Sequence, residues 1–298
     1  MDDARSAPKD DEVVEVTAGN PVPYLNGRTL LRTPSSTLIS SSRWLNEPRI
    51  REWVANENLR RNGADYPLLY GFPEAIQAID ATRDDDRIEA LIKAERKTNK
   101  VLDRWLEERH VSTYTKQDLA DNPPGSIGRM LFEHMDRLGL ETELDPRIQA
   151  NPDWKPERDI EYFNLRSGQT HDFDHLLGEV GFDVISEVFP TGLRTANIYK
   201  HVSPELAGEL LTVNTFTIFP WFMRCQLHYP AAWPAMWRNL SHGYEVGEQS
   251  DCLFTAKYED ILHLNPAEAR AALGMRGFRG PHNSEAASLV FGEGRLII

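Results

Sequence analysis

The stretch DDDRIEALIKAERKTNKVLDRWLEERH, residues 84–110, decides the fold class. Its apolar residues recur at helical spacing and fall largely on one face. They are Ile88, Leu91, Ile92, Leu102, Trp105 and Leu106. The aspartates that open the stretch suit the positive end of a helix dipole. The pattern therefore predicts one long amphipathic helix over residues 84–110.

Helical patterns continue on both sides of this stretch. One starts near Trp44, with Pro48 in the first turn. The others cover residues 126–138, 159–177, 180–189, 204–211, 233–244, 254–262 and 266–273. In the last, Asn265 is the expected N-cap, Pro266 the first residue, and Gly274 the stop. Strand-like alternation is confined to residues 213–218. The sequence predicts an all-α fold.

The two ends of the chain differ from its body. Residues 1–42 are polar and rich in Ser, Thr and Pro, which predicts a flexible N-terminal arm with one short strand at 13–16. Residues 278–298 predict a short irregular C-terminal tail. Residues 43–277 then form a single multi-helix domain.

Charge and cysteine content exclude several classes of protein. Lys and Arg total 33 against 46 Asp and Glu, a net charge of −13. Such a chain repels phosphate, so we expect no nucleic-acid partner and at most peripheral membrane contact. Cys225 and Cys252 form neither a disulfide framework nor a CxxC pair. The N-terminus carries no secretory or transit pattern, which predicts a cytoplasmic protein.

The chemistry concentrates in GQTHDFDHLLGEVGFDVISE, residues 168–187. His171 and His175 are four residues apart, so on a helix they share one face within reach of one ion. Asp172 can ligate too, or orient a histidine. Glu187 lies about 18 Å beyond His175 along a straight helix. It can join them only if the chain turns back near Gly178 and Gly181.

His171-Asp172-x-x-His175, eleven residues and then Glu187 resemble the HDxxH-x(11)-E signature of the coenzyme Q biosynthesis protein 4 family. Residues 124–129 (PGSIGR) resemble the family's Pro/Gly turn into a helix. Tyr258-Glu259-Asp260, with Tyr where the family commonly has Trp, and residues 268–274 resemble its C-terminal motifs. The likeness runs from about residue 45 to 275, and residues 188–232 match poorly.

The resemblance implies an all-α fold with one divalent metal ion held by His171, Asp172, His175 and Glu187. It also implies a role in ubiquinone biosynthesis. There the family is associated with oxidative removal of the ring C1 carboxylate from a prenylated 4-hydroxybenzoate-type intermediate, leaving a hydroxyl. Other ubiquinone-biosynthesis proteins and the inner face of a membrane are the partners it suggests.

The ligand types leave the metal open between Zn²⁺ and Fe²⁺. Iron could activate O₂, the expected co-substrate, whereas zinc could hold phenolate and carboxylate oxygens as a Lewis acid. Asp172 and Glu187 are the candidate catalytic groups, because each can alternate between ligation and proton transfer.

A lipophilic aromatic substrate needs an apolar path. Residues 213–237 hold Phe216, Phe219, Trp221, Phe222, Tyr229, Trp233 and Trp237. Most such stretches are core. Prolines interrupt regular structure in residues 213–237, so these aromatic side chains could instead line a tunnel mouth, contact a membrane or form a homodimer surface.

Three alternatives compete with this interpretation. One is a lipid-binding or assembly protein whose metal is structural. Another is an HD-type phosphohydrolase, with His110 or His134 and Asp183 as the further ligands. The last is a relative that acts on another aromatic acid.

Overall fold

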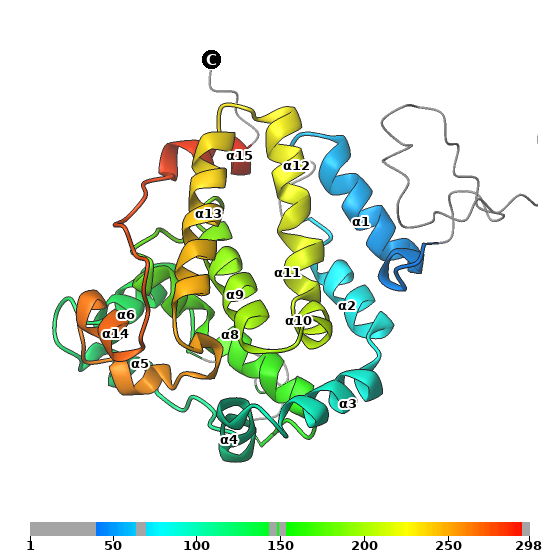
Figure 1. Ribbon diagram of the computed structural model, residues 1–298. Coiled ribbons are helices and arrows are strands. Elements are labelled where there is room, and N and C mark those ends of the chain that lie inside the picture. Colours follow the sequence, from blue (N-terminus) through cyan, green and yellow to red (C-terminus); the bar gives the residue numbers. More distant parts are fainter. Residues whose placement is uncertain (1–39, 64–69, 143–147, 149–152, 294–298) are drawn as a thin grey trace, which may run out of the picture.

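The protein is described by a computed structural model for residues 40–63, 70–142, 148 and 153–293 (Figure 1). The described helices are α1 (Pro48–Leu59), α2 (Phe72–Thr82), α3 (Asp85–Glu95), α4 (Lys100–Glu108), α5 (Lys116–Ala120), α6 (Ile127–Leu138), α8 (Asp159–Leu177), α9 (Val188–His201), α10 (Pro204–Leu210), α11 (Thr212–Thr217), α12 (Phe219–His228), α13 (Trp233–Gln249), α14 (Pro266–Ala272) and α15 (Glu285–Glu293). Short 3-10 turns occur at Trp44–Asn46, Leu253–Thr255 and Tyr258–Ile261. These ranges contain no β-strand, which confirms the all-α prediction.

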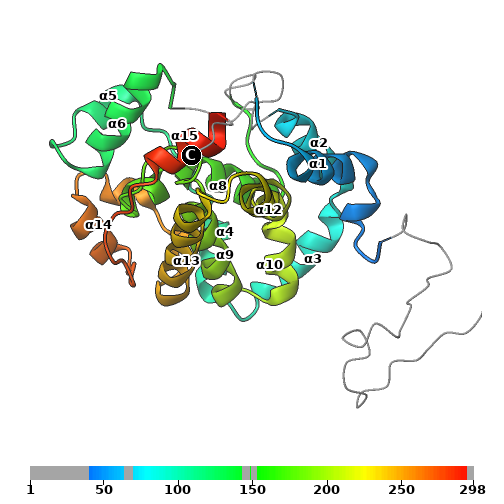
Figure 2. The ribbon, with the colours of Figure 1, turned by 90° about the horizontal axis from the view of Figure 1, so that it is seen from above.

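Helix α9 contacts both α8 and α13, and these three helices lie between α5, α6 and α14 on one side and α1, α2 and α3 on the other (Figures 1 and 2). Helices α9 and α13 make the closest contact, backbone against backbone. A Cβ on Gly243 would lie 2.1 Å from the carbonyl oxygen of Phe189, and one on Gly247 would lie 2.1 Å from that of Leu193. Glycine is therefore what allows these two helices to approach so closely.

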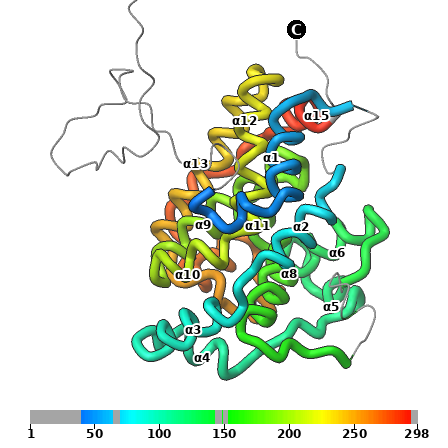
Figure 3. Tube along the Cα trace, turned by 90° about the vertical axis from the view of Figure 1, so that its right-hand side faces the viewer, coloured from blue at the N-terminus to red at the C-terminus, as the bar shows by residue number. Residues whose placement is uncertain are grey.

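Four apolar clusters surround these three helices. Ile88, Trp105 and Tyr162 join α3, α4 and α8 near one end, and Trp221, Met236 and Phe291 join α12, α13 and α15 near the other (Figure 3). A third cluster lies between α6, α8, α9 and α14, and a small one between α1, α2 and α11. No helix in the described ranges is long and apolar enough to cross a membrane.

Helix starts follow their sequence signals closely. Pro48 opens α1, Ser126 caps α6, and Asn265 caps α14 by accepting hydrogen bonds from the amides of Ala267 and Glu268. Asp84 likewise caps α3. Gly274 ends the α14 segment with a φ of 64°, in the left-handed region that glycine tolerates.

The prediction of one long helix over residues 84–110 is wrong, because this segment forms two helices, α3 and α4. Asn99 lies at the break, where its side-chain oxygen accepts from the amide of Leu102 at 3.1 Å and caps α4. Its amide group donates to the carbonyl of His201 at 2.7 Å. This polar residue starts a new helix instead of continuing the old one.

The strand interpretation of residues 213–218 is also wrong, since Thr212–Thr217 form α11. Thr215 and Thr217 donate their hydroxyls to the carbonyls of Leu211 and Val213 at 3.0 and 2.7 Å, which satisfies them within a helix. Val213 and Phe216, three residues apart, pack on the α1–α2 cluster. Tertiary packing here overrides the β propensity.

Three further segments differ from their predictions. Of the helix predicted over 180–189, only the last two residues are helical, at the start of α9. Residues 254–262 form 3-10 turns rather than a helix. In the predicted tail, residues 278–284 are irregular, but Glu285–Glu293 form α15 with Phe291 fully buried. The strand predicted at 13–16 lies outside the described residues.

The aromatic stretch at 213–237 is divided between core and surface. Trp221, Phe222 and Tyr229 are buried, whereas Phe219 and Trp237 are exposed. Packing therefore accounts for much of the stretch.

Candidate metal centre

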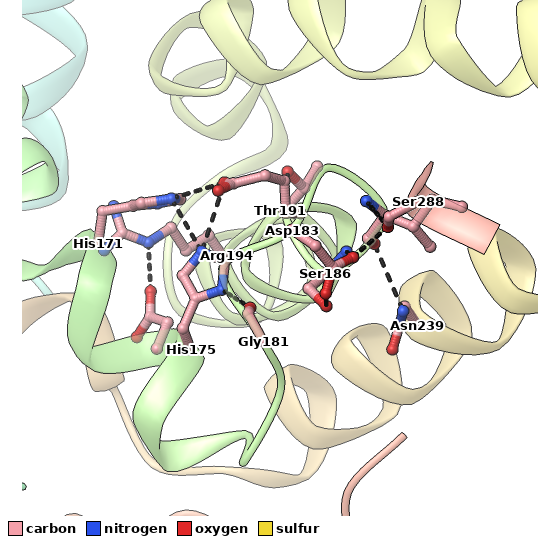
Figure 4. A network of polar contacts seen from close by, with 12 residues as sticks. His171, His175, Gly181, Asp183, Ser186, Thr191, Arg194, Asn239 and Ser288 are labelled. Carbon is pink, nitrogen blue, oxygen red and sulfur yellow. Dashed lines mark hydrogen bonds and ion pairs between the residues drawn. The ribbon is translucent and has the colours of Figure 1, made fainter. Parts of the chain in front are cut away.

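Helix α8 carries the two histidines of the predicted site one turn apart. The His175 side chain is fully buried, whereas the His171 side chain is 36% exposed. Their Nε2 atoms are 3.3 Å apart (Figure 4). The pair therefore reaches from the protein interior to a solvent-accessible edge.

Glu187 is returned to the histidines by a turn of the chain at the predicted glycines. Helix α8 ends at Leu177, and Gly178 follows in a position where a Cβ would lie 2.3 Å from the ring of Phe189. The chain then loops through residues 178–187, and Glu187 directly precedes α9. The expected reversal near Gly178 and Gly181 is confirmed.

Three donor atoms meet at this point. The Glu187 Oε2 atom lies 2.9 Å from His171 Nε2 and 3.4 Å from His175 Nε2. Metal–nitrogen and metal–oxygen bonds of about 2.1 Å place neighbouring donors about 3.0 Å apart in octahedral geometry and about 3.4 Å apart in tetrahedral geometry. The three separations, 2.9, 3.3 and 3.4 Å, lie within about 0.1 Å of these values. The donor set therefore fits a divalent cation with positions left open.

The tautomer of His175 supports the same conclusion. Its Nδ1 atom is 2.7 Å from the carbonyl oxygen of Gly181, which can only accept, so Nδ1 carries the proton. In the neutral ring, the Nε2 lone pair then faces the Glu187 carboxylate. Two lone-pair atoms in contact repel unless a proton or a cation lies between them. Fixing a ligand histidine by a hydrogen bond from its other nitrogen is the usual arrangement around metals.

Aromatic stacking holds the His175 ring in place. Phe182 stacks on it with ring centroids 4.7 Å apart, and Phe182 also stacks on His134 with centroids 3.5 Å apart. Phe182 belongs to the same loop as Gly181. One short segment thus fixes both the plane and the tautomer of the buried ligand.

The pKa values of these groups reflect their mutual contacts. Burial alone would raise the pKa of Glu187, but hydrogen bonds to His171 and His175 outweigh it and bring the pKa well below its usual range. Burial lowers the pKa of His175, but contact with Glu187 exceeds that effect and the net pKa is raised. The pKa of His134 is lowered by burial. Without a metal, these contacts favour the ionised form of Glu187 and the protonated form of His175.

Asp172 does not join the three donors. Consecutive residues of a helix point about 100° apart, so Asp172 cannot share the face of His171 and His175. It still acts on the cluster, because its charge is among the influences that raise the pKa of His175. The structure supports Asp172 as a neighbour of the centre and gives no geometric support to it as a ligand.

The extra ligands of an HD-type phosphohydrolase are not in the cluster either. His110 pairs with Glu259 at 3.3 Å, and His134 is stacked on Phe182. Asp183 accepts hydrogen bonds from Ser186, Ser284 and Ser288. This arrangement argues against that alternative.

A buried polar network joins α8 to α9 and to the Tyr258–Ile261 turn, and sequence reasoning did not predict it. Asp174 accepts hydrogen bonds from Arg194 of α9 and, at 3.0 Å, from the hydroxyl of Tyr258. The next residue, Glu259, pairs with Arg166 of α8 at 2.9 Å. Sequence reasoning assigns Arg194 no role, and the consecutive residues Tyr258 and Glu259 were the signal that could have revealed the network.

The comparisons with known proteins give a fold likeness. No protein-family model matches the chain, and no curated protein matches its sequence. The chain is similar to a crystal structure of a candidate ubiquinone biosynthesis protein from Nostoc punctiforme, with a TM-score of 0.50 and 20% identity. The match covers 76% of this chain and 94% of that one. At this identity the likeness shows a shared fold.

Proposed function

We propose that this protein binds one divalent ion through His171, His175 and Glu187 and works in ubiquinone biosynthesis. Its reaction would be the oxidative decarboxylation of a prenylated 4-hydroxybenzoate-type intermediate. The observation that carries the proposal is the convergence of three donor atoms 2.9–3.4 Å apart, with the His175 tautomer fixed by Gly181. The signature spacing and the fold likeness to the Nostoc punctiforme protein support the pathway.

The exposure of the donors favours a catalytic ion over a structural one. Structural zinc sites are closed by four protein ligands, whereas catalytic sites keep a position for water or substrate. Here three donors converge, and the His171 and Glu187 side chains are 36% and 32% exposed. Substrate oxygens can therefore reach the centre from solvent, which a purely scaffolding protein would not require.

The proposed reaction breaks the bond from the ring to its carboxylate and forms a bond from the same carbon to oxygen. Water supplies the hydroxyl oxygen, the carboxylate carbon leaves as carbon dioxide, and O₂ takes up the two electrons released, together with two protons, and leaves as hydrogen peroxide. A bound ion supplies a Lewis acid for the substrate's phenolate and carboxylate oxygens, with redox chemistry as well if it is iron.

The protein's own groups have separate tasks in this proposal. His175 is held rigidly by Gly181 and Phe182, so it fixes the position of the centre. His171 and Glu187 lie at the accessible edge and orient the substrate there. Asp172, adjacent but outside the donor set, is the candidate group for proton transfer.

Elemental analysis of protein purified without chelators tests the metal. We expect about one divalent ion per chain in the wild type and loss of the ion in His171→Ala. The exposed His263 provides a matched control, since His263→Ala should keep the ion. Wild-type protein without metal would refute the centre.

The reaction is tested with a prenylated 4-hydroxybenzoate under air and under nitrogen. We expect hydroxylated product and CO₂ only with O₂ present. Equal turnover without O₂ or another oxidant would contradict oxidative decarboxylation. If the metal-loaded protein forms no product under air, this reaction is refuted, and binding of a lipophilic aromatic acid is the next property to measure. Membrane contact, a homodimer and association with other ubiquinone-biosynthesis proteins stay predictions.

A further inference from the structure

The C-terminal helix α15 contacts the loop that forms the candidate metal centre. This helix lies in the part of the chain that the sequence predicted as a tail, beyond the region of family resemblance. Ser284 directly precedes it, and Ser288 follows one turn later on the same face. Both side chains are buried, and both hydroxyls donate to Asp183 in the 178–187 loop.

Asp183 is the point where the loop's internal bonds and the helix meet (Figure 4). From within the loop, it accepts from the amide and hydroxyl of Ser186 at 3.1 and 2.7 Å. Ser288 also accepts from the amide of Ile185 at 2.9 Å. The helix therefore bonds to both the side chain and the backbone of the loop, within two or four residues of Glu187.

Apolar packing fixes α15 in this position. Phe291 is fully buried against Trp221 and Tyr229, and its carbonyl accepts from the side chain of Asn62. Ile185 of the loop is buried in the same cluster. The helix thus connects the loop to the α12–α13 end of the molecule.

We propose that α15 is a clamp that positions the metal centre, with Asp183 as the positioning residue through which it acts. The same loop supplies Gly181, Phe182 and Glu187, so its conformation decides whether three donors converge. Ser284 and Ser288 hold that conformation. This inference rests on the proposed metal centre and adds to it a determinant located outside the signature motif.

The test compares the full-length Ser284→Ala/Ser288→Ala double variant with wild type by Co²⁺ titration. We expect the variant to bind Co²⁺ about 10–100-fold more weakly, the usual effect of losing groups that support ligands. Its visible Co²⁺ spectrum should also change, because the donors are displaced. Asp183→Asn should behave alike.

Two controls separate positioning from general destabilisation. Leu289→Ala changes an exposed residue of α15 and should leave affinity and spectrum unchanged. Ile88→Val removes a methylene from the distant α3 cluster. It should lower the melting temperature without altering the Co²⁺ spectrum. Wild-type affinity and spectrum in the serine double variant would overturn the clamp.

Hydrogen exchange tests the clamp without metal. The amides of Val180 and Glu187 bond to the carbonyls of His175 and Asp183, so they report on the loop rather than on the mutated serines. We expect both to exchange faster in the double variant. If the wild type binds no metal, the metal centre fails, and these amides alone decide the clamp. Unchanged exchange would then overturn it.

Discussion

The affinity of the proposed centre for metal should rise with pH, and His175 should contribute at least one displaced proton to the slope. The pKa of His175 is raised above 6.5 by Glu187, so below that pH the metal-free protein holds a proton where the metal must bind. Binding one metal ion then releases that proton. One displaced proton gives a tenfold change in affinity per pH unit, about 1.4 kcal/mol.

The sign follows from the same shift in the metal-free protein. A raised pKa means that protonated His175 stabilises the fold fully below pH 6.5, and that this contribution is lost as pH rises through the folded-state pKa. Stabilisation by bound metal increases with pH instead, because the metal binds the deprotonated ring. Stabilisation by metal should therefore grow as the stability of the metal-free protein declines.

Co²⁺ titration at pH 5.5 and 6.5, with a competing chelator of known pH dependence, measures the slope. We expect at least about a tenfold increase in affinity between these values. In Glu187→Gln, burial lowers the pKa of His175 without an opposing carboxylate, so binding should be weaker and the slope smaller. A wild-type affinity that stays flat over this interval would refute the reasoning, as would an unchanged slope in Glu187→Gln.

Four substitutions away from the donors, one of them a control, test the packing around the site by urea unfolding. Tyr258→Phe removes a buried hydroxyl that donates to Asp174 and should cost about 1.5–3 kcal/mol, while the exposed Tyr199→Phe should change stability by less than about 0.5 kcal/mol. Gly243→Ala places a methyl against the α9 backbone and should cost about 3 kcal/mol or more. Gly168→Ala meets no atom within 4 Å and should stabilise α8 by about 0.5–1 kcal/mol. Equal effects of the two alanines would show that α9 and α13 are not packed as described.

Local signals predicted several helix starts and the three residues that meet at the candidate site. Caps such as Ser126 and Asn265 act within one turn, so they can be recognised without tertiary structure. The His171–His175 spacing and the glycines before Glu187 are local too. The sequence therefore predicted both the histidine face and the turn that returns the carboxylate.

The errors lie where distant partners decide the local structure. The alternation around Thr215 and Thr217 is typical of a strand, yet α11 is helical because Val213 and Phe216 pack on α1 and α2. The C-terminal residues looked like a tail, but α15 is ordered by Asp183 and by the α12–α13 cluster. None of these partners is close in sequence.

Helix α8 shows why the site and the fold are hard to separate. It buries Arg166, Asp174 and His175, and each has a partner from a different element, namely Glu259, Arg194 and the carbonyl of Gly181. Buried ion pairs contribute little net stability compared with apolar side chains of the same size, but removing one partner leaves a charge stranded.

Such contacts therefore define position more than they add stability. They fix the rotation of α8 about its axis, and that rotation aims His171 and His175 at Glu187. An α8 with an apolar buried face could pack equally well in several rotations. The polar partners favour a single rotation of α8, and in that rotation the three donor atoms meet.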